Sequence, residues 1–263
     1  DQGLAAGPLV RDDLMLQVQG GKLYADGALG SRGALLLADY SDAPGTRGLA
    51  VTPRDHLVDV CRRARAAGFQ VATHAIGDGA NRLVLDVYDE VLGPRDRDLR
   101  WRIEHAQIVD PADLDRFAGL GVIASMQPTH CTSDMDWAPR RLGPDRLVGA
   151  YAWRTLADRG AVLSFGSDAP VEAVDPIAGL YAARTRMHPD GTPAGGWRAH
   201  ERLTGREALR AFTLGPAYSA RCEARVGVLA PGRLADVTVL SDDPTRVAPD
   251  ALLELRPSRT IVH

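Results

Sequence analysis

The sequence predicts an α/β fold built on a parallel sheet. Short runs that favour β-strands alternate along the chain with longer stretches whose apolar residues recur at helical spacing. This alternation is typical of parallel strands joined by helices that pack outside the sheet. No G-x-G-x-x-G turn follows an early run, which argues against a dinucleotide-binding fold. The pattern fits both an open doubly wound sheet and a (β/α)8 barrel.

Five strands and five helices are predicted before about residue 217. The helix that starts at Thr52-Pro53 is expected to stop at Gly68, because a Thr N-cap, a first-turn proline and a terminal glycine mark its ends. Asp110-Pro111 opens another helix that ends near residues 119–121. The strands are predicted at residues 21–25, 71–75, 101–105, 122–126 and 162–166, and the remaining helices at 83–91, 145–160 and 204–214.

The pattern changes from about residue 226. Residues 227–240 predict a turn followed by a strand, and residues 258–263 start a second strand, with no helix expected between them. We therefore predict two parts, a larger α/β part over residues 1–217 and a smaller β-rich part over 218–263. Two strands are too few to be stable alone, so this second part is incomplete as it stands.

Composition excludes several classes of protein. The 263 residues carry 31 Lys+Arg and 34 Asp+Glu, and a net charge of -3 does not suit a basic nucleic-acid binder or a polybasic membrane-surface protein. Charged residues interrupt every apolar stretch, so no membrane-spanning helix is predicted. Three scattered cysteines favour a reducing compartment, and we expect a cytoplasmic location. The chain begins at Asp1 without a methionine or a visible signal peptide, so we expect its natural N-terminus to be absent.

Four polar residues lie on the predicted strands or just beyond them. They are Lys22, the single lysine of the chain, and His74, His105 and Asp168. Taken singly, each has an ordinary explanation as a surface lysine, a hydrogen-bonded core histidine or a capping aspartate. Together they lie at or near the carboxyl ends of successive strands, which is the face where barrel enzymes build their active sites. Neutral imidazoles with a carboxylate suit Zn²⁺ or a similar divalent ion, so the pattern predicts a metal site.

The linear motifs around these residues resemble the metal-dependent amidohydrolase superfamily. More narrowly, they are similar to its amidohydrolase-3 branch, which includes N-substituted formamide deformylases. The tail motif Gly-x-Leu-x-Pro-Gly-x-x-Ala-Asp over residues 227–236 resembles the return of that superfamily into a small β-sandwich. The other motifs cover residues 22–32, 74–78, 104–107, 126–130 and 166–171.

The resemblance implies a (β/α)8 barrel with one or two divalent metal ions, most simply zinc, at its C-terminal mouth. Residues 1–217 would be the C-terminal part of that barrel, from about strand four, and residues 218–263 part of the sandwich. His74 and His105 would be metal ligands, and Asp168 a metal ligand and the general base. Lys22 matches a lysine that is carbamylated in many relatives, a modification that burial of the amine would favour.

One departure from the family pattern is clear. The His-x-His pair expected on the first barrel strand does not occur in this chain, whose other histidines lie elsewhere. The resemblance therefore implies that the N-terminal remainder of the barrel is a partner of this chain, and that the metal site and the sheet edges are incomplete without it. The assembly of the chain as a homo-oligomer stays open as a further expectation.

The predicted activity is hydrolysis of a carbon–nitrogen bond in a small amide- or formamide-type substrate by metal-activated water. His130 and Gln107, just beyond two of the predicted strands, are candidates for substrate binding. Two alternatives stay open. One is a deaminase of the same superfamily, which would attack a ring carbon. The other is a non-catalytic fragment or binding protein that keeps the fold without the first-strand histidine pair.

Overall fold

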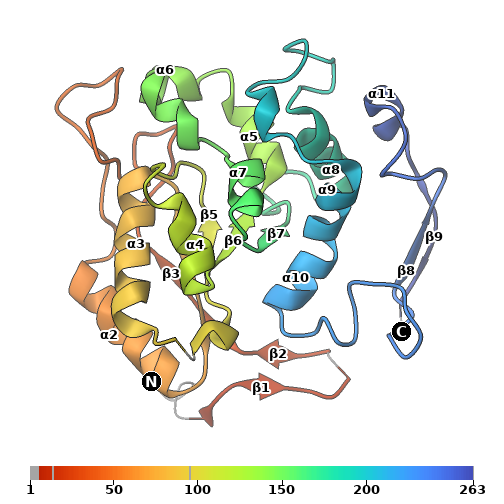
Figure 1. Ribbon diagram of the computed structural model, residues 1–263, viewed down its shortest axis with the longest axis horizontal. Helices are drawn as coiled ribbons and strands as arrows, with labels where there is room; N and C mark the ends of the chain where they lie inside the picture. The colour runs from red at the N-terminus through yellow and green to blue at the C-terminus, as the bar shows by residue number, and fades with distance from the viewer. Residues whose placement is uncertain (1–5, 14, 95, 263) are drawn as a thin grey trace. The chain divides into compact units, whose positions relative to one another are not determined.

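The computed structural model describes residues 6–13, 15–94 and 96–262. Helices and strands alternate along most of this length (Figure 1). The chain divides into two compact units, and each draws on more than one stretch of sequence. The first unit comprises Asp1–Ser125, Trp137–Ala152 and Asp158–Val162, and the second comprises Met126–Asp136, Trp153–Ala157 and Leu163–His263.

The first unit is built on a parallel sheet whose strands follow one another in chain order. Tyr24 faces His74 across the first pair of strands, and Ala75 faces His105 across the second. The carboxyl ends of three strands therefore lie side by side, as the sequence predicts for an α/β fold. The strands are β3 (Gly20–Tyr24), β4 (Gln70–Ala75), β5 (Arg102–His105) and β6 (Ile123–Met126).

Three helices connect these strands, α2 (Arg54–Ala66), α3 (Asp78–Val91) and α4 (Leu114–Leu120). Both α2 and α3 contact β4, and they also pack against each other. On α2, the buried Leu57, Cys61 and Ala64 recur at helical spacing, as the sequence predicts. Burial of each large apolar side chain on these faces contributes about 1.5–3 kcal/mol to folding. The helices thus fix β4, the strand that carries His74.

The predicted helix over residues 145–160 is wrong as a single element. The structure has a 3-10 turn, η2 (Asp145–Gly149), followed by the short helix α7 (Trp153–Asp158). A side chain at Gly149 would bring its Cβ within 1.6 Å of the Val109 carbonyl oxygen, and Ala150 forms a β-bridge with Ile108. This pairing with a distant segment interrupts the helix.

The first unit also contains β1 (Leu9–Val10), β2 (Gln17–Val18), η1 (Asp96–Leu99) and α6 (Ala138–Leu142).

The second unit consists mainly of helices around the short strand β7 (Leu163–Phe165). Both α9 and α10 contact β7, and α8 contacts α5 and α9. The predicted helix over 204–214 is confirmed as α9, which begins with a capping box made by Thr204 and Glu207. The helices are α5 (Pro128–Asp134), α8 (Pro176–Thr185), the 3-10 turn η3 (Ala199–Glu201), α9 (Gly205–Phe212) and α10 (Leu214–Ser219).

The tail forms an antiparallel pair of strands, β8 (Val237–Leu240) and β9 (Pro257–Ile261). The expectation of a helix-free tail is wrong, because the four-residue helix α11 (Pro249–Leu252) begins at a proline between the two strands. His263, at the end of the second predicted strand, lies outside the described residues. The predicted division after residue 217 falls within α10 and stays a prediction.

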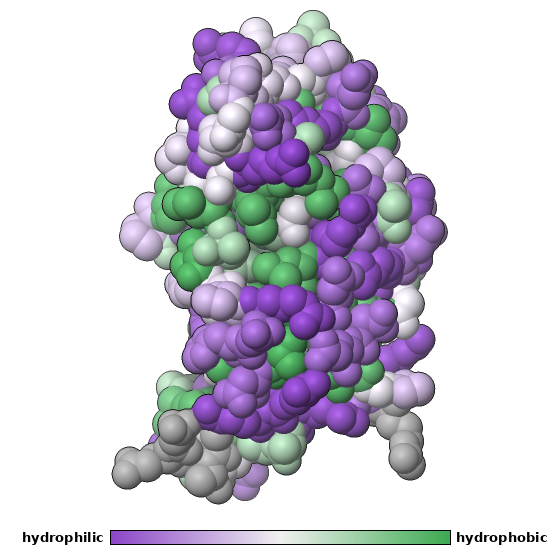
Figure 2. Space-filling model, turned by 90° about the vertical axis from the view of Figure 1, so that its left-hand side faces the viewer, coloured by the Kyte–Doolittle hydropathy of each residue, from purple (hydrophilic) through white to green (hydrophobic). Residues whose placement is uncertain are grey.

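Several large apolar side chains lie on the surface, among them Leu49 and Val51. On the face shown in Figure 2, apolar side chains gather in a band between two hydrophilic zones. Within the described part of the chain, no helix has both the length and the apolar character needed to cross a bilayer.

Candidate functional site

Two of the predicted ligands, His74 and His105, lie next to each other in the first unit. Their ring centroids are 4.6 Å apart, and the Tyr24 ring lies 5.5 Å from that of His74. Both imidazoles come from the carboxyl ends of adjacent parallel strands, and His105 is buried. The structure therefore brings these two histidines together at one end of the sheet.

The backbone where β5 ends is strained. His105 has φ 78° and Ala106 has φ 44°, both in the left-handed region that residues with a Cβ seldom adopt. The Ala106 N–H donates to the carbonyl of Ala75 at 3.1 Å, which ties this bend to the end of β4. Strained backbone of this kind persists where the surroundings enforce it, and it concentrates at functional sites.

Lys22 lies on β3, two residues before the end of that strand. It pairs with Ala72, two positions before the Tyr24–His74 pair, so it shares a face of the sheet with Tyr24. Its Nζ is 5.2 Å from the centroid of the Tyr24 ring. Lys22 is exposed on β3, the terminal strand in the order of the described sheet, so the burial that would favour carbamylation of its amine is not provided by the described residues.

Glu104 lies beside these histidines, although its sequence pattern alone does not indicate a role there. It faces His74 across β4 and β5, and its carboxylate accepts a hydrogen bond from the Arg102 Nε–H at 2.6 Å. Burial opposes ionisation of Glu104. The neighbouring Arg102 guanidinium, the Ser125 hydroxyl and the positive charge of Lys22 outweigh that effect and lower the pKa of Glu104 below its ordinary value. An anionic carboxylate therefore stands on the same face as His74.

Asp26 is a second residue whose role the sequence did not reveal. Its side chain is fully buried, and its Oδ1 lies 3.4 Å from Nε2 of His74. Burial raises the pKa of Asp26 to about 7, although hydrogen bonds from three backbone N–H groups act in the opposite direction. Its Asp-Gly sequence resembles an ordinary turn, so only the contact with a strand about fifty residues away distinguishes it.

The turn after β4 is held by close backbone packing. A Cβ at Gly77 would lie 2.0 Å from the Leu35 carbonyl oxygen, so only glycine fits there. The buried Asp78 accepts hydrogen bonds from the N–H groups of Leu37 and Gly79, both at 2.9 Å. The Gly77-Asp78-Gly79 motif thus clamps the long loop after β3 to the end of β4.

The second unit contains another pair of candidate residues. His130 lies on α5 and Asp168 follows β7, with His130 Nε2 3.9 Å from Asp168 Oδ2. Asp168 is exposed and has φ 59°, a conformation that aspartate tolerates better than most residues. Burial lowers the pKa of His130, partly offset by the charges of Asp168 and Glu172, so the imidazole is neutral at neutral pH.

Gln107, the other predicted substrate contact, is buried two residues after His105. Its backbone carbonyl accepts a hydrogen bond from the Tyr151 N–H at 2.6 Å. This bond fixes the segment that follows the strained bend at His105. A role for Gln107 or His130 in substrate binding stays a prediction.

The donor atoms present suit a divalent metal ion. His74 and His105 bring two imidazoles together in the first unit, and His130 and Asp168 bring an imidazole and a carboxylate together in the second. Nitrogen and carboxylate oxygen donors of this kind bind Zn²⁺ and similar ions. The residues therefore fit the metal that the sequence predicts.

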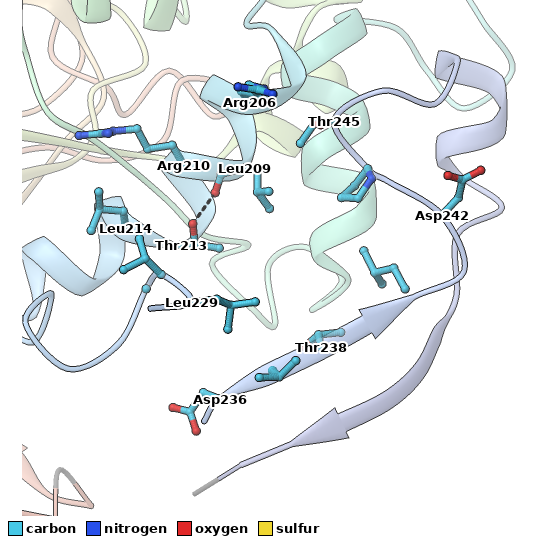
Figure 3. Close-up of a pocket in the computed structure, with 15 residues that line it drawn as sticks. Arg206, Leu209, Arg210, Thr213, Leu214, Leu229, Asp236, Thr238, Asp242 and Thr245 are labelled. Atoms are coloured by element: carbon cyan, nitrogen blue, oxygen red, sulfur yellow. Dashed lines mark hydrogen bonds between the residues drawn. The ribbon is translucent and has the colours of Figure 1, made fainter. Parts of the chain in front are cut away.

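The second unit also holds a cavity of about 870 Å³ between α9, α10 and the strand β8 (Figure 3). Leu209, Leu214 and Leu229 give it an apolar wall, and Arg206 and Arg210 lie at its border. Thr213 donates its hydroxyl hydrogen to the Leu209 carbonyl at 2.8 Å within this wall. None of the predicted site residues lines this cavity.

Three known proteins resemble the sequence over most of its length. Protein LONG AFTER FAR-RED 3 of Arabidopsis thaliana is 40% identical over 86% of this chain and 39% of its own length. Putative amidohydrolase YtcJ of Bacillus subtilis (strain 168) is 38% identical over 92% of this chain and 45% of its own. N-substituted formamide deformylase of Arthrobacter pascens is 29% identical over 78% of this chain and 37% of its own. The chain thus spans less than half the length of each of these relatives.

The fold also resembles a solved structure, that of an uncharacterized metal-dependent hydrolase from Pyrococcus horikoshii OT3. The TM-score is 0.82 at 33% sequence identity, and the likeness covers 94% of this chain and 50% of that protein. The family model described as the amidohydrolase family matches residues 6–263, which is nearly the whole sequence. The chain therefore belongs to the amidohydrolase family.

Proposed function

We propose that this chain carries active-site residues of a metal-dependent hydrolase that cleaves a carbon–nitrogen bond in a small amide- or formamide-type substrate. The observation that carries the proposal is the 4.6 Å approach of the His74 and His105 rings at the carboxyl ends of adjacent parallel strands. Membership of the amidohydrolase family supports it, as does the resemblance to a formamide deformylase and to a metal-dependent hydrolase.

In this proposal β3 to β7 are strands four to eight of a (β/α)8 barrel, and the tail is part of a β-sandwich. The parallel order of β3 to β6 supports the barrel. The N-terminal remainder of the barrel would then be the partner of β3 and would cover Lys22, whose amine could then be carbamylated. We also propose a cytoplasmic location, which is supported by the three cysteines, all of them free thiols. A homo-oligomer is proposed as a further assembly.

His74, His105 and Asp168 would hold the metal, with Lys22 as a further ligand in its carbamylated form. The ion, which we propose to be zinc, would act as a Lewis acid that polarises the substrate carbonyl and makes a water molecule more acidic. These ligand assignments follow from the family pattern and from the chemistry of the donor atoms.

Asp168 is suited to the role of general base. Its carboxylate is exposed, so it can accept a proton from the attacking water and pass that proton to the leaving nitrogen. The neutral His130 beside it can hydrogen-bond the substrate without repelling a metal ion. Gln107 would contact the substrate, or would hydrogen-bond a metal-binding side chain and so orient it.

The direct test is hydrolysis of N-substituted formamides and simple amides by the full chain, with one portion loaded with Zn²⁺ and a second stripped by a chelator. We expect turnover in the zinc-loaded protein and its loss on chelation, restored when zinc is returned. Absence of turnover both from this chain and from the intact gene product, with less than one equivalent of bound zinc, would refute the proposal.

A further inference from the structure

The side-chain amide of Asn81 fastens the segment that follows β5 to the start of α3. Asn81 has no exposed surface and lies in the first turn of that helix. Its nitrogen Nδ2 donates to the carbonyl of Gly77 at 2.9 Å and to the carbonyl of Ile108 at 3.0 Å. A primary amide has two N–H hydrogens, so these two bonds use both of them. Ile108 comes three residues after His105, beyond the strained bend.

The same nitrogen also contacts the segment that follows β4. The carbonyls of Ala75 and Ile76 each accept from Asn81 Nδ2 at 3.3 Å, as longer, shared hydrogen bonds. These two carbonyls also accept the backbone hydrogen bonds between the strand ends, from the N–H of Ala106 at 3.1 Å and that of Ile108 at 2.9 Å. Asn81 therefore shares its acceptors with the bonds that join β4 and β5 just beyond their two histidines.

Four carbonyl oxygens thus converge on the nitrogen of one buried amide. These oxygens carry partial charges of the same sign and repel one another, and the two amide hydrogens offset that repulsion. Away from water the attraction between the hydrogens and the oxygens is stronger than it would be at the surface. The amide of Asn81 thereby sets the spacing between the segments that follow His74 and His105.

We propose that Asn81 is a positioning residue that holds His74 and His105 at the spacing at which both rings bind one metal ion. The ring centroids are 4.6 Å apart, and a zinc ion binds imidazole nitrogens at about 2.0–2.1 Å, so a small displacement of either strand end would lengthen a metal–ligand bond. Residues that support metal ligands in this way typically contribute about 10- to 100-fold to metal affinity. This inference rests on the proposed function, because it assigns Asn81 a role toward the metal of that site.

Tyr88, on the same helix, offers a matched control. Its buried hydroxyl also bridges β4 and β5, since it lies 2.7 Å from the Thr73 hydroxyl and donates to the carbonyl of Arg102 at 3.1 Å. Arg102 begins β5, so this bridge meets that strand at the end opposite His105. Tyr88→Phe removes a buried polar bridge between the same two strands and leaves the bonds beyond the histidines in place. A purely structural role of Asn81 predicts similar effects of substitution at the two positions.

The first experiment measures the approach of the two histidine rings in the full metal-free chain. Nuclear Overhauser cross-peaks between the ring protons of His74 and His105 are recorded for the unsubstituted chain, Asn81→Ala and Tyr88→Phe, and the His74→Gln protein assigns the signals. We expect the cross-peak in the unsubstituted chain and in Tyr88→Phe, and its loss or marked weakening in Asn81→Ala. Its absence from the unsubstituted chain, or equal intensity in all three proteins, would overturn the inference.

Asn81→Ser is a second variant that keeps the test decisive if Asn81→Ala does not fold. A serine hydroxyl on a helix can donate to the carbonyl four residues earlier, here that of Gly77, which preserves the local bond at the start of α3. The serine side chain is too short to reach the Ile108 carbonyl. Asn81→Ser therefore removes the bridge to the segment after β5, and we expect it to weaken the cross-peak as Asn81→Ala does.

The second experiment measures Zn²⁺ binding by calorimetry. Asn81→Ser is expected to weaken zinc binding by about 10- to 100-fold, with Tyr88→Phe within about threefold of the unsubstituted chain. Equal losses in the two variants would contradict the role of Asn81. If the unsubstituted chain and Asn81→Ser bind zinc equally well, the inference fails and the proposed function stands. If the ring cross-peak depends on Asn81 but the unsubstituted chain binds no zinc, the proposed function fails, and the role of Asn81 toward a metal fails with it.

Discussion

Asp168 is the residue on which the proposed chemistry depends most. It lies in a Gly-Ser-Asp-Ala-Pro segment after β7, with φ 59° and an exposed carboxylate near His130. Asparagine tolerates the same left-handed conformation and has nearly the same shape, so a substitution can remove the basic group without disturbing the backbone. Activity and folding can therefore be separated at this position.

Asp168→Asn is expected to lower kcat by about 10²- to 10⁴-fold, the range usual for loss of a general acid–base group. The melting temperature should stay close to that of the unsubstituted chain, since Asp168 is exposed. Glu172→Gln is the matched control, because it removes a negative charge from the same loop and should leave kcat within about twofold. Kinetics with a formamide substrate check both. Undiminished turnover in Asp168→Asn would refute its role as base.

At the residue scale, the sequence predicted His74 and His105 but not the neighbouring carboxylates. His74 and His105 follow from a simple rule, that polar residues at the ends of buried strands meet at one edge of a parallel sheet. Asp26 and Glu104 could not be found this way, because their significance depends on cross-strand register and on backbone donors that lie about fifty residues from Asp26. Exposure of Lys22 likewise depends on what lies beside β3.

At the scale of elements, α9 is fixed by polar contacts at its start. Glu207 closes the capping box with Thr204 and also pairs with Arg154, whose Nη1–H donates to it at 2.9 Å. The hydrogen bonds from Arg154 and Thr204 lower the pKa of Glu207 to about 2 from an ordinary value of 4.5, with burial acting in the opposite sense. A carboxyl group with a depressed pKa stabilises the folded state above its unfolded pKa and loses that contribution as pH falls through the folded value.

Glu207→Gln should therefore lower the melting temperature at neutral pH, and its difference from the unsubstituted chain should shrink between about pH 4.5 and about pH 2. Glu207 is partly exposed, so solvent screening keeps the effect modest. Glu254→Gln is the control, since the more exposed Glu254 pairs with Arg256 only at 3.8 Å. Calorimetric melting across this pH range checks the prediction. A difference that grows as the pH falls would contradict it.

The elements show where sequence patterns are sufficient and where they are not. Each predicted strand overlaps an observed one, because a short apolar run between two helical stretches leaves few alternatives. The helix expected over residues 145–160 is split, because Gly149 and Ala150 pair with a segment about forty residues earlier. Local sequence propensity does not predict a tertiary pairing of this kind.

At the scale of the whole molecule, the chain spans 50% or less of the length of the three relatives and the metal-dependent hydrolase described above. The His-x-His pair that the family resemblance implies does not occur in this sequence. In the proposed site the chain itself would contribute His74, His105 and Asp168, with Lys22 as a further ligand in its carbamylated form. A site that retains these ligands should still bind a metal ion, more weakly than a complete one. Binding of an ion to the folded state alone stabilises it, by about 2.7 kcal/mol when the free ion is at 100 times its Kd.

Zn²⁺ should accordingly raise the melting temperature of the chain in a concentration-dependent way, and His105→Gln should abolish most of that shift. His56→Gln, which changes an exposed histidine on α2, is the control and should behave like the unsubstituted protein. Differential scanning fluorimetry over a series of zinc concentrations measures the effect. Equal shifts in all three proteins would show that zinc acts elsewhere on the chain.

The central claim, that His74 and His105 together form part of a metal site, is tested most directly by calorimetric titration of Zn²⁺ into the metal-free chain and its variants. We predict stoichiometric binding to the unsubstituted chain and to His56→Gln, and at least about a tenfold loss of affinity in both His74→Gln and His105→Gln. Zinc binding that is absent from the unsubstituted chain, or unchanged when either strand-end histidine is replaced, would contradict the claim.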